Sequence, residues 1–308
     1  IFVCVIDEVR IGFNDDFLYL MFLNTFYKIT KKPRFWFRFF TDLRRRCSEQ
    51  FSCSQHITLD IEIFIPRYLE ITQYLILMEF NLCKVNNGIY NVFVIEDDEY
   101  IGPAIARGYE WDGWMRRDIQ ENYKPGTDIL DIGANIGYNT LMFSDYGPVH
   151  TFEPVYDEIV DMNIKNNNLK NQVKLYGCAL SNVECVSTMY IPQRGCKYEN
   201  KINYGWTSLC MHEERFGNQM VHTQCKRLDD IYDGIPSIIK IDVEGHELQV
   251  LEGAINTIKT HMPMILIEIH DFENSEIPKF LENLGYGVPI ERPEAMFLYR
   301  AKDIFSIM

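Results

Sequence analysis

Hydrophobic positions along residues 78–308 follow two alternating patterns. Short continuous apolar runs indicate buried strands of a parallel sheet, and stretches with apolar residues every three or four positions indicate helices packed on that sheet. The runs predict strands at residues 91–96, 129–132, 149–153, 173–179, 238–243 and 264–269. Because strands alternate with helices, the pattern predicts an α/β fold with a doubly wound, mostly parallel sheet.

Three stretches have helical spacing. One carries Trp111, Trp114, Met115, Asp118 and Ile119 on one face, the second Leu248, Leu251, Ile255 and Ile258, and the third Ile277, Phe280, Leu281 and Leu284. Asn274 or Ser275 is suited to cap the third helix, and Gly285 to end it. Two short strands at residues 287–291 and 295–299 flank a turn and predict a closing antiparallel hairpin.

Two segments do not follow the alternation of strand and helix patterns. Residues 1–77 keep neither period and mix aromatic with basic residues, which favours a poorly defined N-terminal extension over a membrane-surface or nucleic-acid-binding one. The domain pattern begins at Met78, so a natural start at that residue is a hypothesis. Residues 183–226 form a long polar insertion, which is typical of a lid or binding loop.

Composition narrows the class of protein. The net charge is -14, and residues 78–308 carry 20 basic against 35 acidic residues, which disfavours nucleic acid as a partner. Nine cysteines without a Cys-x-x-Cys pair indicate reduced thiols and predict a cytoplasmic location. No apolar run is long enough to predict a membrane span, and no secretory signal is visible. The oligomeric state stays open.

A glycine-containing turn directly follows the predicted strand at 129–132. Gly133 and Gly137 allow close approach of a ligand, and Asp131 places a carboxylate beside the turn, which suits a cationic donor better than a pyrophosphate. Glu153 ends the next strand, where an acidic side chain can accept hydrogen bonds from ribose hydroxyls. Together these residues predict a nucleoside cofactor at the carboxyl edge of the sheet.

Five ordered motifs between residues 110 and 270 resemble the FkbM-type methyltransferase family. They are residues 128–140 (DILDIGANIGYNT), 151–154 (TFEP), 179–181 (ALS), 239–247 (IKIDVEGHE) and 267–270 (IEIH). The resemblance implies a Rossmann-like class I methyltransferase that moves a methyl group from S-adenosylmethionine to a hydroxyl oxygen of a sugar or other small molecule or glycan. Residues 1–77 have no counterpart in it.

The resemblance also implies positions for the cofactor. Asp131, Gly133, Ala134, Asn135 and Gly137 would surround its methionine part, Glu153 its ribose, and Ala179, Leu180 and Ser181 its adenine, while Glu110 would close the pocket. The insertion contains Gly205-Trp-Thr-Ser208, which resembles a stretch placed near the pocket in such enzymes. Trp206 there, and Trp111 and Trp114 earlier, either contact substrate or cover core.

A second charged group follows the later strands and supplies the catalytic candidates. These are Asp242, Glu244, His246, Glu268 and His270, with Asp242 also assigned to the cofactor. Methyl transfer requires the acceptor hydroxyl to lose a proton, and His270 or His246 suits the role of base. Alternatively, Asp242 caps a helix, the glutamates favour the positive end of a helix dipole, and the histidines are merely solvated. Asp242, Glu268 and His270 could also bind a divalent ion, although the spacing requires none, so no metal is predicted.

Three other functions remain open. A nicotinamide-dependent oxidoreductase would use Glu153 and the glycine turn too, but Asp131 and the missing third glycine disfavour it. A non-catalytic cofactor-binding module would keep the same residues without turnover. Methylation of RNA at a ribose hydroxyl fits the chemistry, and the acidic charge of the domain disfavours it.

Overall fold

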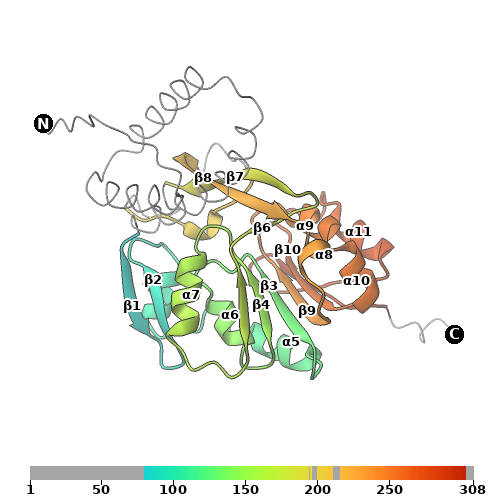
Figure 1. Cartoon of the computed structure of the whole chain (residues 1–308), viewed down its shortest axis with the longest axis horizontal. Coiled ribbons are helices and arrows are strands. Elements are labelled where there is room, and N and C mark those ends of the chain that lie inside the picture. Colours follow the sequence, from blue (N-terminus) through green and yellow to red (C-terminus); the bar gives the residue numbers. More distant parts are fainter. Residues whose placement is uncertain (1–79, 194, 196–199, 211–215, 303–308) are drawn as a thin grey trace, which may run out of the picture. The chain divides into compact units, whose positions relative to one another are not determined.

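The computed structural model describes residues 80–193, 195, 200–210 and 216–302 of the 308 residues. The predicted extension at 1–77 and its boundary with residue 78 lie outside the described residues. A seven-stranded sheet with the strand order β11-β12-β10-β9-β3-β4-β5 forms the centre of the described part (Figure 1). The long parallel strands of this sheet are those that the apolar runs predicted.

The parallel part of the sheet consists of five strands. They are β3 (Asp128–Ile132), β4 (Val149–Phe152), β5 (Val173–Tyr176), β9 (Pro236–Ile241) and β10 (Met264–Glu268). β9 pairs in parallel with both β3 and β10, and β4 pairs in parallel with both β3 and β5. Strand order reverses at β3 and β9, which is where an open sheet of this kind forms its ligand crevice.

Two buried cores cover the two faces of the sheet. Successive strand residues point to opposite faces, so Ile129 belongs to one core and Leu130 to the other. The first core contains residues of α5 (Met115–Asn122), α6 (Tyr138–Phe143) and α7 (Asp157–Lys165). The second contains residues of α8 (Leu228–Ile231), α9 (Glu247–Gly253), α10 (Ile255–His261) and α11 (Ile277–Asn283), which lie together in Figure 1. The fold is therefore the predicted Rossmann-like, doubly wound arrangement.

Antiparallel hairpins stand at both ends of the described chain. β11 (Ile290–Glu291) pairs with β12 (Met296–Tyr299), and β12 continues the sheet antiparallel to β10, which confirms the closing hairpin. At the other end β1 (Leu82–Asn86) pairs with β2 (Asn91–Ile95), followed by α4 (Ile101–Ala106). No helix in the described part of the chain has the length and apolar character that a membrane crossing would need.

The polarity of the insertion suggested a loop, but much of the insertion forms regular structure. It contributes β7 (Cys185–Pro192), the short 3-10 helix η1 (Tyr204–Trp206) and β8 (Phe216–Lys226). β8 pairs antiparallel with β7 and parallel with β6 (Ala179–Leu180), which makes a separate three-stranded sheet. The prediction failed because cross-strand pairing, rather than apolar periodicity, stabilises these half-exposed strands.

Three predicted elements are divided or shortened. The strand predicted at 173–179 ends at Tyr176, and Ala179 belongs to the second sheet instead. The helix predicted around Leu251 is two helices, because the backbone leaves helical geometry at Ala254. Trp111 precedes α5, and Trp114 stands at its first flanking position. Spacing alone gave no sign of these interruptions, since apolar contacts continue across them.

A lysine lies inside the centre of the sheet. The Lys240 side chain is only 2% exposed, and Lys240 is the second-to-last residue of β9. Its Nζ donates to Gly133 O at 2.9 Å and lies 3.2 Å from Asp242 Oδ2 and 3.6 Å from Asp131 Oδ1. Burial alone would lower the pKa of Lys240, but the carboxylates of Asp242 and Asp131 outweigh burial and hold that pKa above its usual value. The ammonium therefore fastens the end of β3 to the end of β9.

Replacing this lysine tests how much the fold depends on it. Lys240→Met keeps the apolar stem and removes the charge, which leaves the buried Asp131 carboxylate without its cation. We expect the free energy of unfolding, measured by urea denaturation, to fall by about 3 to 5 kcal/mol. Lys259→Met, a change in the last turn of α10, should leave it within about 0.5 kcal/mol of the original protein. Adding Asp131→Asn to Lys240→Met should recover part of the loss; a Lys240→Met protein as stable as the Lys259→Met control would contradict the assignment.

Candidate active site

A cavity of about 570 Å³ opens at the carboxyl ends of the central strands. The residues after β3, β4, β9 and β10 contribute to its wall, together with residues of the insertion and of the closing hairpin. This is the edge at which the sequence predicted a ligand site. Fifteen residues were assigned to this site from the sequence, some from their pattern and some from the resemblance, so where each of them lies relative to this cavity matters.

The glycine turn after β3 forms one part of the wall. Gly133, Ala134 and Asn135 line the cavity. Gly133 has φ +80°, and a Cβ there would lie 1.8 Å from Asp242 O, so no other residue fits without moving the backbone. Gly137, with φ +82°, is the residue before α6 and lies behind the lining residues. The turn thus brings backbone, not side chains, to the cavity.

Asp131 lies beneath the cavity and not on its surface. Its side chain is fully buried, and Oδ2 accepts a hydrogen bond from Thr140 Oγ1 at 2.5 Å. Burial raises the pKa of this carboxyl, while Lys240 and the Thr140 hydrogen bond oppose that effect. The predicted direct approach of Asp131 to a ligand is therefore not what the geometry shows. The carboxylate instead holds Lys240, which does line the cavity.

Glu153 lies on the cavity wall in a ring of backbone donors. Oε1 accepts hydrogen bonds from the N–H groups of Val155 and Tyr156, at 2.8 and 3.0 Å, and Oε2 accepts one from Asn135 at 2.8 Å. Burial raises the pKa of this carboxyl to about 7, although the three N–H donors favour its ionised form. Oε1 already accepts two hydrogen bonds and Oε2 accepts one, so Oε2 keeps a further lone pair that can accept a ligand hydroxyl.

The three residues predicted near the adenine, and the one predicted to close the pocket, do not all reach the cavity. Ala179 and Leu180 line the cavity. Ser181 is buried just beyond them, with Oγ 2.9 Å from His246 Nε2. Glu110 lies outside the lining residues, because Arg116 Nε donates to its carboxylate at 2.5 Å.

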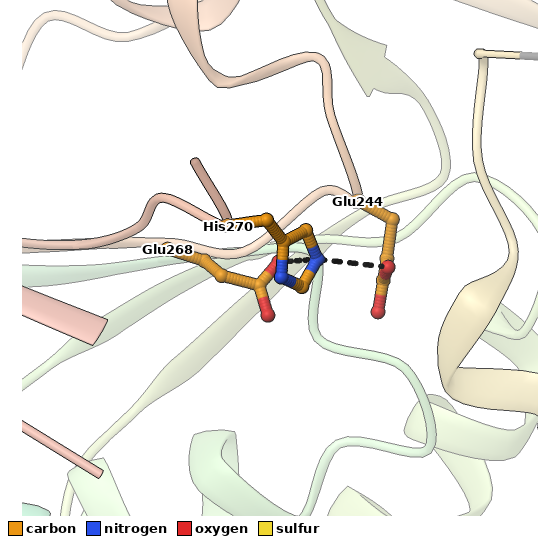
Figure 2. A group of neighbouring side chains, drawn as sticks. All are labelled: Glu244, Glu268 and His270. Atoms are coloured by element: carbon orange, nitrogen blue, oxygen red, sulfur yellow. Dashed lines mark ion pairs between the residues drawn. The ribbon is translucent and has the colours of Figure 1, made fainter. Parts of the chain in front are cut away.

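Four predicted catalytic side chains gather on another part of the wall. Asp242, Glu244, Glu268 and His270 all line the cavity. Figure 2 shows Glu268 and His270 reaching from one segment toward Glu244 on another. His270 Nε2 lies 3.3 Å from Glu268 Oε2 and 3.5 Å from Glu244 Oε2. Burial, followed by the carboxylates of Asp242 and Glu244, raises the pKa of Glu268.

His246, the fifth catalytic candidate, also lines the cavity but contacts Ser181. Burial lowers the pKa of its imidazole. It is the residue before α9, where no side chain caps the helix. Asp242 does not cap α9 either, because His246 is the residue that precedes this helix. The geometry therefore excludes the interpretation of Asp242 as a helix cap.

The turn that carries Glu244 differs from the expected continuation of the strand. β9 ends at Ile241, and Glu244 adopts φ +56°, a left-handed conformation that costs a non-glycine residue free energy. Ser208 Oγ donates to Glu244 O at 2.6 Å. Glu247 Oε1 accepts from the N–H groups of Val243 and Gly245 at 3.2 and 3.0 Å. Surrounding hydrogen bonds therefore fix the direction of the Glu244 side chain.

The side chains that could hold a metal ion in the structure differ from those that the sequence analysis considered. Donor atoms of Glu244, Glu268 and His270 all lie within 4.8 Å of one another. The sequence-based alternative named Asp242 in place of Glu244. In the structure the Asp242 carboxylate faces Lys240.

The lining residues to which the sequence analysis gave no role include Lys240, Asp112, Asn139 and Glu294. Asn139 Nδ2 donates to Asp112 Oδ2 at 2.9 Å, and burial, followed by Asp112, raises the pKa of Glu294 to about 7. A lysine within the apolar run 238–241 was a visible signal for Lys240. Nothing local marks the others, because the fold brings them together from distant segments.

Aromatic candidates divide between cavity and core. Trp111 and Trp206 line the cavity, as do Gly205 and Thr207 of the same insertion motif. Trp114 packs against the first core. Trp111 also packs against this core, and contact of Trp111 or Trp206 with a substrate stays a prediction.

Comparisons with known proteins give one consistent family. A family model described as the methyltransferase FkbM domain matches residues 131–288, more than half of the chain. Methyltransferase sdnD from Sordaria araneosa is 28% identical over 215 residues, which cover 58% of this chain and 79% of that protein. The 31-O-demethyl-FK506 methyltransferase FkbM from Streptomyces tacrolimicus is 25% identical over 209 residues, with the same two coverages.

A solved structure is also similar. The crystal structure of methyltransferase FkbM from Methylobacillus flagellatus KT superimposes with a TM-score of 0.40 and 18% identity, over 56% of this chain and 43% of that chain. The match thus spans less than half the length of that solved relative. On the strength of the family model, the chain belongs to the FkbM methyltransferase domain family.

Proposed function

We propose that this methyltransferase moves a methyl group from S-adenosylmethionine to a hydroxyl oxygen of a small molecule or glycan. The observation that carries the proposal is one cavity with two chemically different parts. A side-chain-poor turn beside Glu153 borders it on one part, and the cluster of Glu244, Glu268 and His270 borders it on another. The first suits a nucleoside donor, and the second suits an acceptor that must lose a proton.

The residues present fit the proposed donor. Glu153 Oε2 can accept a ribose hydroxyl while the carboxylate keeps all three of its backbone donors. Asn139 is 6% exposed and its Oδ1 accepts no hydrogen bond from any described residue, which leaves an acceptor at the cavity wall. Asp242 offers a partly exposed carboxylate to a cationic group, and Lys240 holds that carboxylate in place. Bound S-adenosylmethionine supplies an electrophilic methyl group on a positively charged sulfur.

We assign activation of the acceptor hydroxyl to the cluster of Glu244, Glu268 and His270. Glu268 and Glu244 are 11% and 12% exposed and His270 is 50% exposed, so the imidazole is the member most open to solvent. The hydroxyl proton passes to the His270 imidazole as the oxygen bonds to the methyl carbon, and the methyl–sulfur bond breaks to leave S-adenosylhomocysteine. His246 is a weaker choice for this step, because its Nε2 contacts Ser181 next to the predicted adenine segment.

Charge supports a neutral acceptor. Six carboxylate side chains line the cavity, against the single ammonium of Lys240 and the imidazoles of His246 and His270; the carboxylates are those of Asp112, Glu153, Asp242, Glu244, Glu268 and Glu294. A phosphate-bearing acceptor such as RNA would meet like charge there. The relative from Streptomyces tacrolimicus is named a 31-O-demethyl-FK506 methyltransferase, and that name describes an oxygen as the methylated atom.

Calorimetry distinguishes the proposed donor from its nicotinamide rival. S-Adenosylhomocysteine, the product form of the donor, should bind the full chain with a saturable heat signal, and NAD should give none. Glu153→Gln should weaken that binding at least about tenfold, because an amide NH₂ replaces one acceptor and faces backbone N–H donors. Glu252→Gln, an exposed change on α9, serves as the matched control and should bind normally. Heat from NAD alone would overturn the proposal.

The raised pKa of Glu153 predicts a pH dependence of binding. Ribose hydroxyls donate best to the ionised carboxylate, and with a pKa of about 7 the free protein holds a proton there at lower pH. Affinity for S-adenosylhomocysteine should therefore be constant above pH 8 and fall below about pH 7, by up to about tenfold per pH unit. Titrations from pH 5.5 to 8.5 would measure it. The Glu153→Gln protein should lack this slope; a slope of equal size in that variant would assign the effect to another group.

A further inference from the structure

The cluster of Glu244, Glu268 and His270 has the composition of a metal site as well as that of a catalytic group. Glu268 is the last residue of β10, His270 follows two residues later, and Glu244 lies in the turn after the neighbouring β9. Figure 2 shows the two carboxylates on either side of the imidazole. Two oxygens and one imidazole nitrogen are donors that divalent transition ions accept.

Two of the separations are close to those of donor atoms that share one ion. With bonds of about 2.1 Å, two donors around an ion lie about 3.0 to 3.4 Å apart at angles between roughly 90° and 110°. His270 Nε2 is 3.3 Å from Glu268 Oε2 and 3.5 Å from Glu244 Oε2. All three donor atoms fall within 4.8 Å of each other. Small side-chain rotations would therefore bring them onto a common centre.

When both of its carboxylates are ionised, the charge in the cluster is not balanced by its own members. Two carboxylates face one imidazole, which contributes at most one positive charge. The nearest buried ammonium, Lys240, already contacts Asp242, Asp131 and the carbonyl of Gly133. Glu268 Oε2 is shielded from solvent and accepts no hydrogen bond from any residue in the described ranges. A divalent cation would neutralise this cluster and satisfy that oxygen.

The carboxylate on the turn is held in place by other segments. Glu244 keeps its left-handed backbone because Ser208 donates to its carbonyl and Glu247 accepts from the flanking N–H groups. A left-handed glutamate before Gly245 aims its side chain across the turn toward His270. Donors fixed in this way lose little entropy when they bind an ion, which favours binding.

We propose that Glu244, Glu268 and His270 bind one divalent transition ion, such as Mn²⁺ or Zn²⁺, at the acceptor part of the cavity. Three protein donors leave coordination positions open, as in catalytic rather than structural sites. The functional consequence rests on the proposed function. A hydroxyl bound at an open position would lose its proton more readily, and with His270 bound to the ion that proton would pass to water. The oxygen would then form its bond to the methyl carbon as the methyl–sulfur bond breaks.

Binding of Mn²⁺ alone tests the site without any methyl acceptor. The full chain is treated with a chelator, dialysed and titrated with Mn²⁺, and free Mn²⁺ is followed by electron paramagnetic resonance. We expect one saturable site per chain. Glu268→Gln and His270→Ala should each weaken it at least about tenfold, because each removes one of three donors. Zn²⁺ should displace the bound Mn²⁺.

Two control variants test whether a loss of Mn²⁺ binding is specific to the cluster. His222→Ala removes an exposed histidine on β8, and Glu252→Gln removes an exposed carboxylate on α9; both should bind Mn²⁺ as the original chain does. Thermal denaturation of every variant shows whether it is folded. Unchanged Mn²⁺ affinity in folded Glu268→Gln and His270→Ala proteins, or no saturable Mn²⁺ binding in the original chain, would overturn the proposal.

Parallel calorimetry with S-adenosylhomocysteine separates this proposal from the proposed function. A protein that binds S-adenosylhomocysteine but no Mn²⁺ refutes the metal site and leaves methyl transfer standing. A protein whose Mn²⁺ site responds to Glu268→Gln but which binds no S-adenosylhomocysteine supports the metal site and refutes the donor.

Discussion

The buried ammonium of Lys240 is the interaction on which the site depends. It lies in the middle of the sheet and joins the carbonyl of Gly133 to the carboxylates of Asp131 and Asp242. A charge in such a place is tolerated only when opposite charges and hydrogen bonds surround it. These contacts bring the ends of β3 and β9 together, and the cavity opens where these two ends meet.

Close packing at the same point explains the glycine turn. Gly133 approaches Asp242 O so closely that a Cβ would overlap it, and its φ of +80° suits glycine alone. The turn therefore does two things at once: it lets the strand ends approach, and it presents backbone to the cavity. Asp131, which looked like a ligand contact in the sequence, works one layer deeper by neutralising the lysine.

How far the sequence predicted this arrangement depended on the range of the interactions. Apolar runs identified the parallel strands, because burial on both faces leaves a continuous local signal. Glu153, Glu244, Glu268 and His270 could be placed at the cavity because carboxyl ends of parallel strands share an edge. Asp112 and Glu294 could not, since they reach the wall from a turn before α5 and from the closing hairpin. The second sheet was missed for the same reason: its strands are defined by partners and not by their own periodicity.

The part of the insertion around η1 links the two parts of the cavity. Tyr204 O in the insertion accepts a hydrogen bond from Asn135 Nδ2 of the glycine turn, and Ser208 Oγ, four residues later, donates to Glu244 O. One short segment thus touches both the proposed donor part and the cluster of Glu244, Glu268 and His270. Each contact joins a short side chain to a backbone carbonyl. A shift of this segment would therefore move both parts of the site together. The insertion is therefore a structural part of the cavity wall, and variation in its sequence can reshape that wall without changing the central sheet.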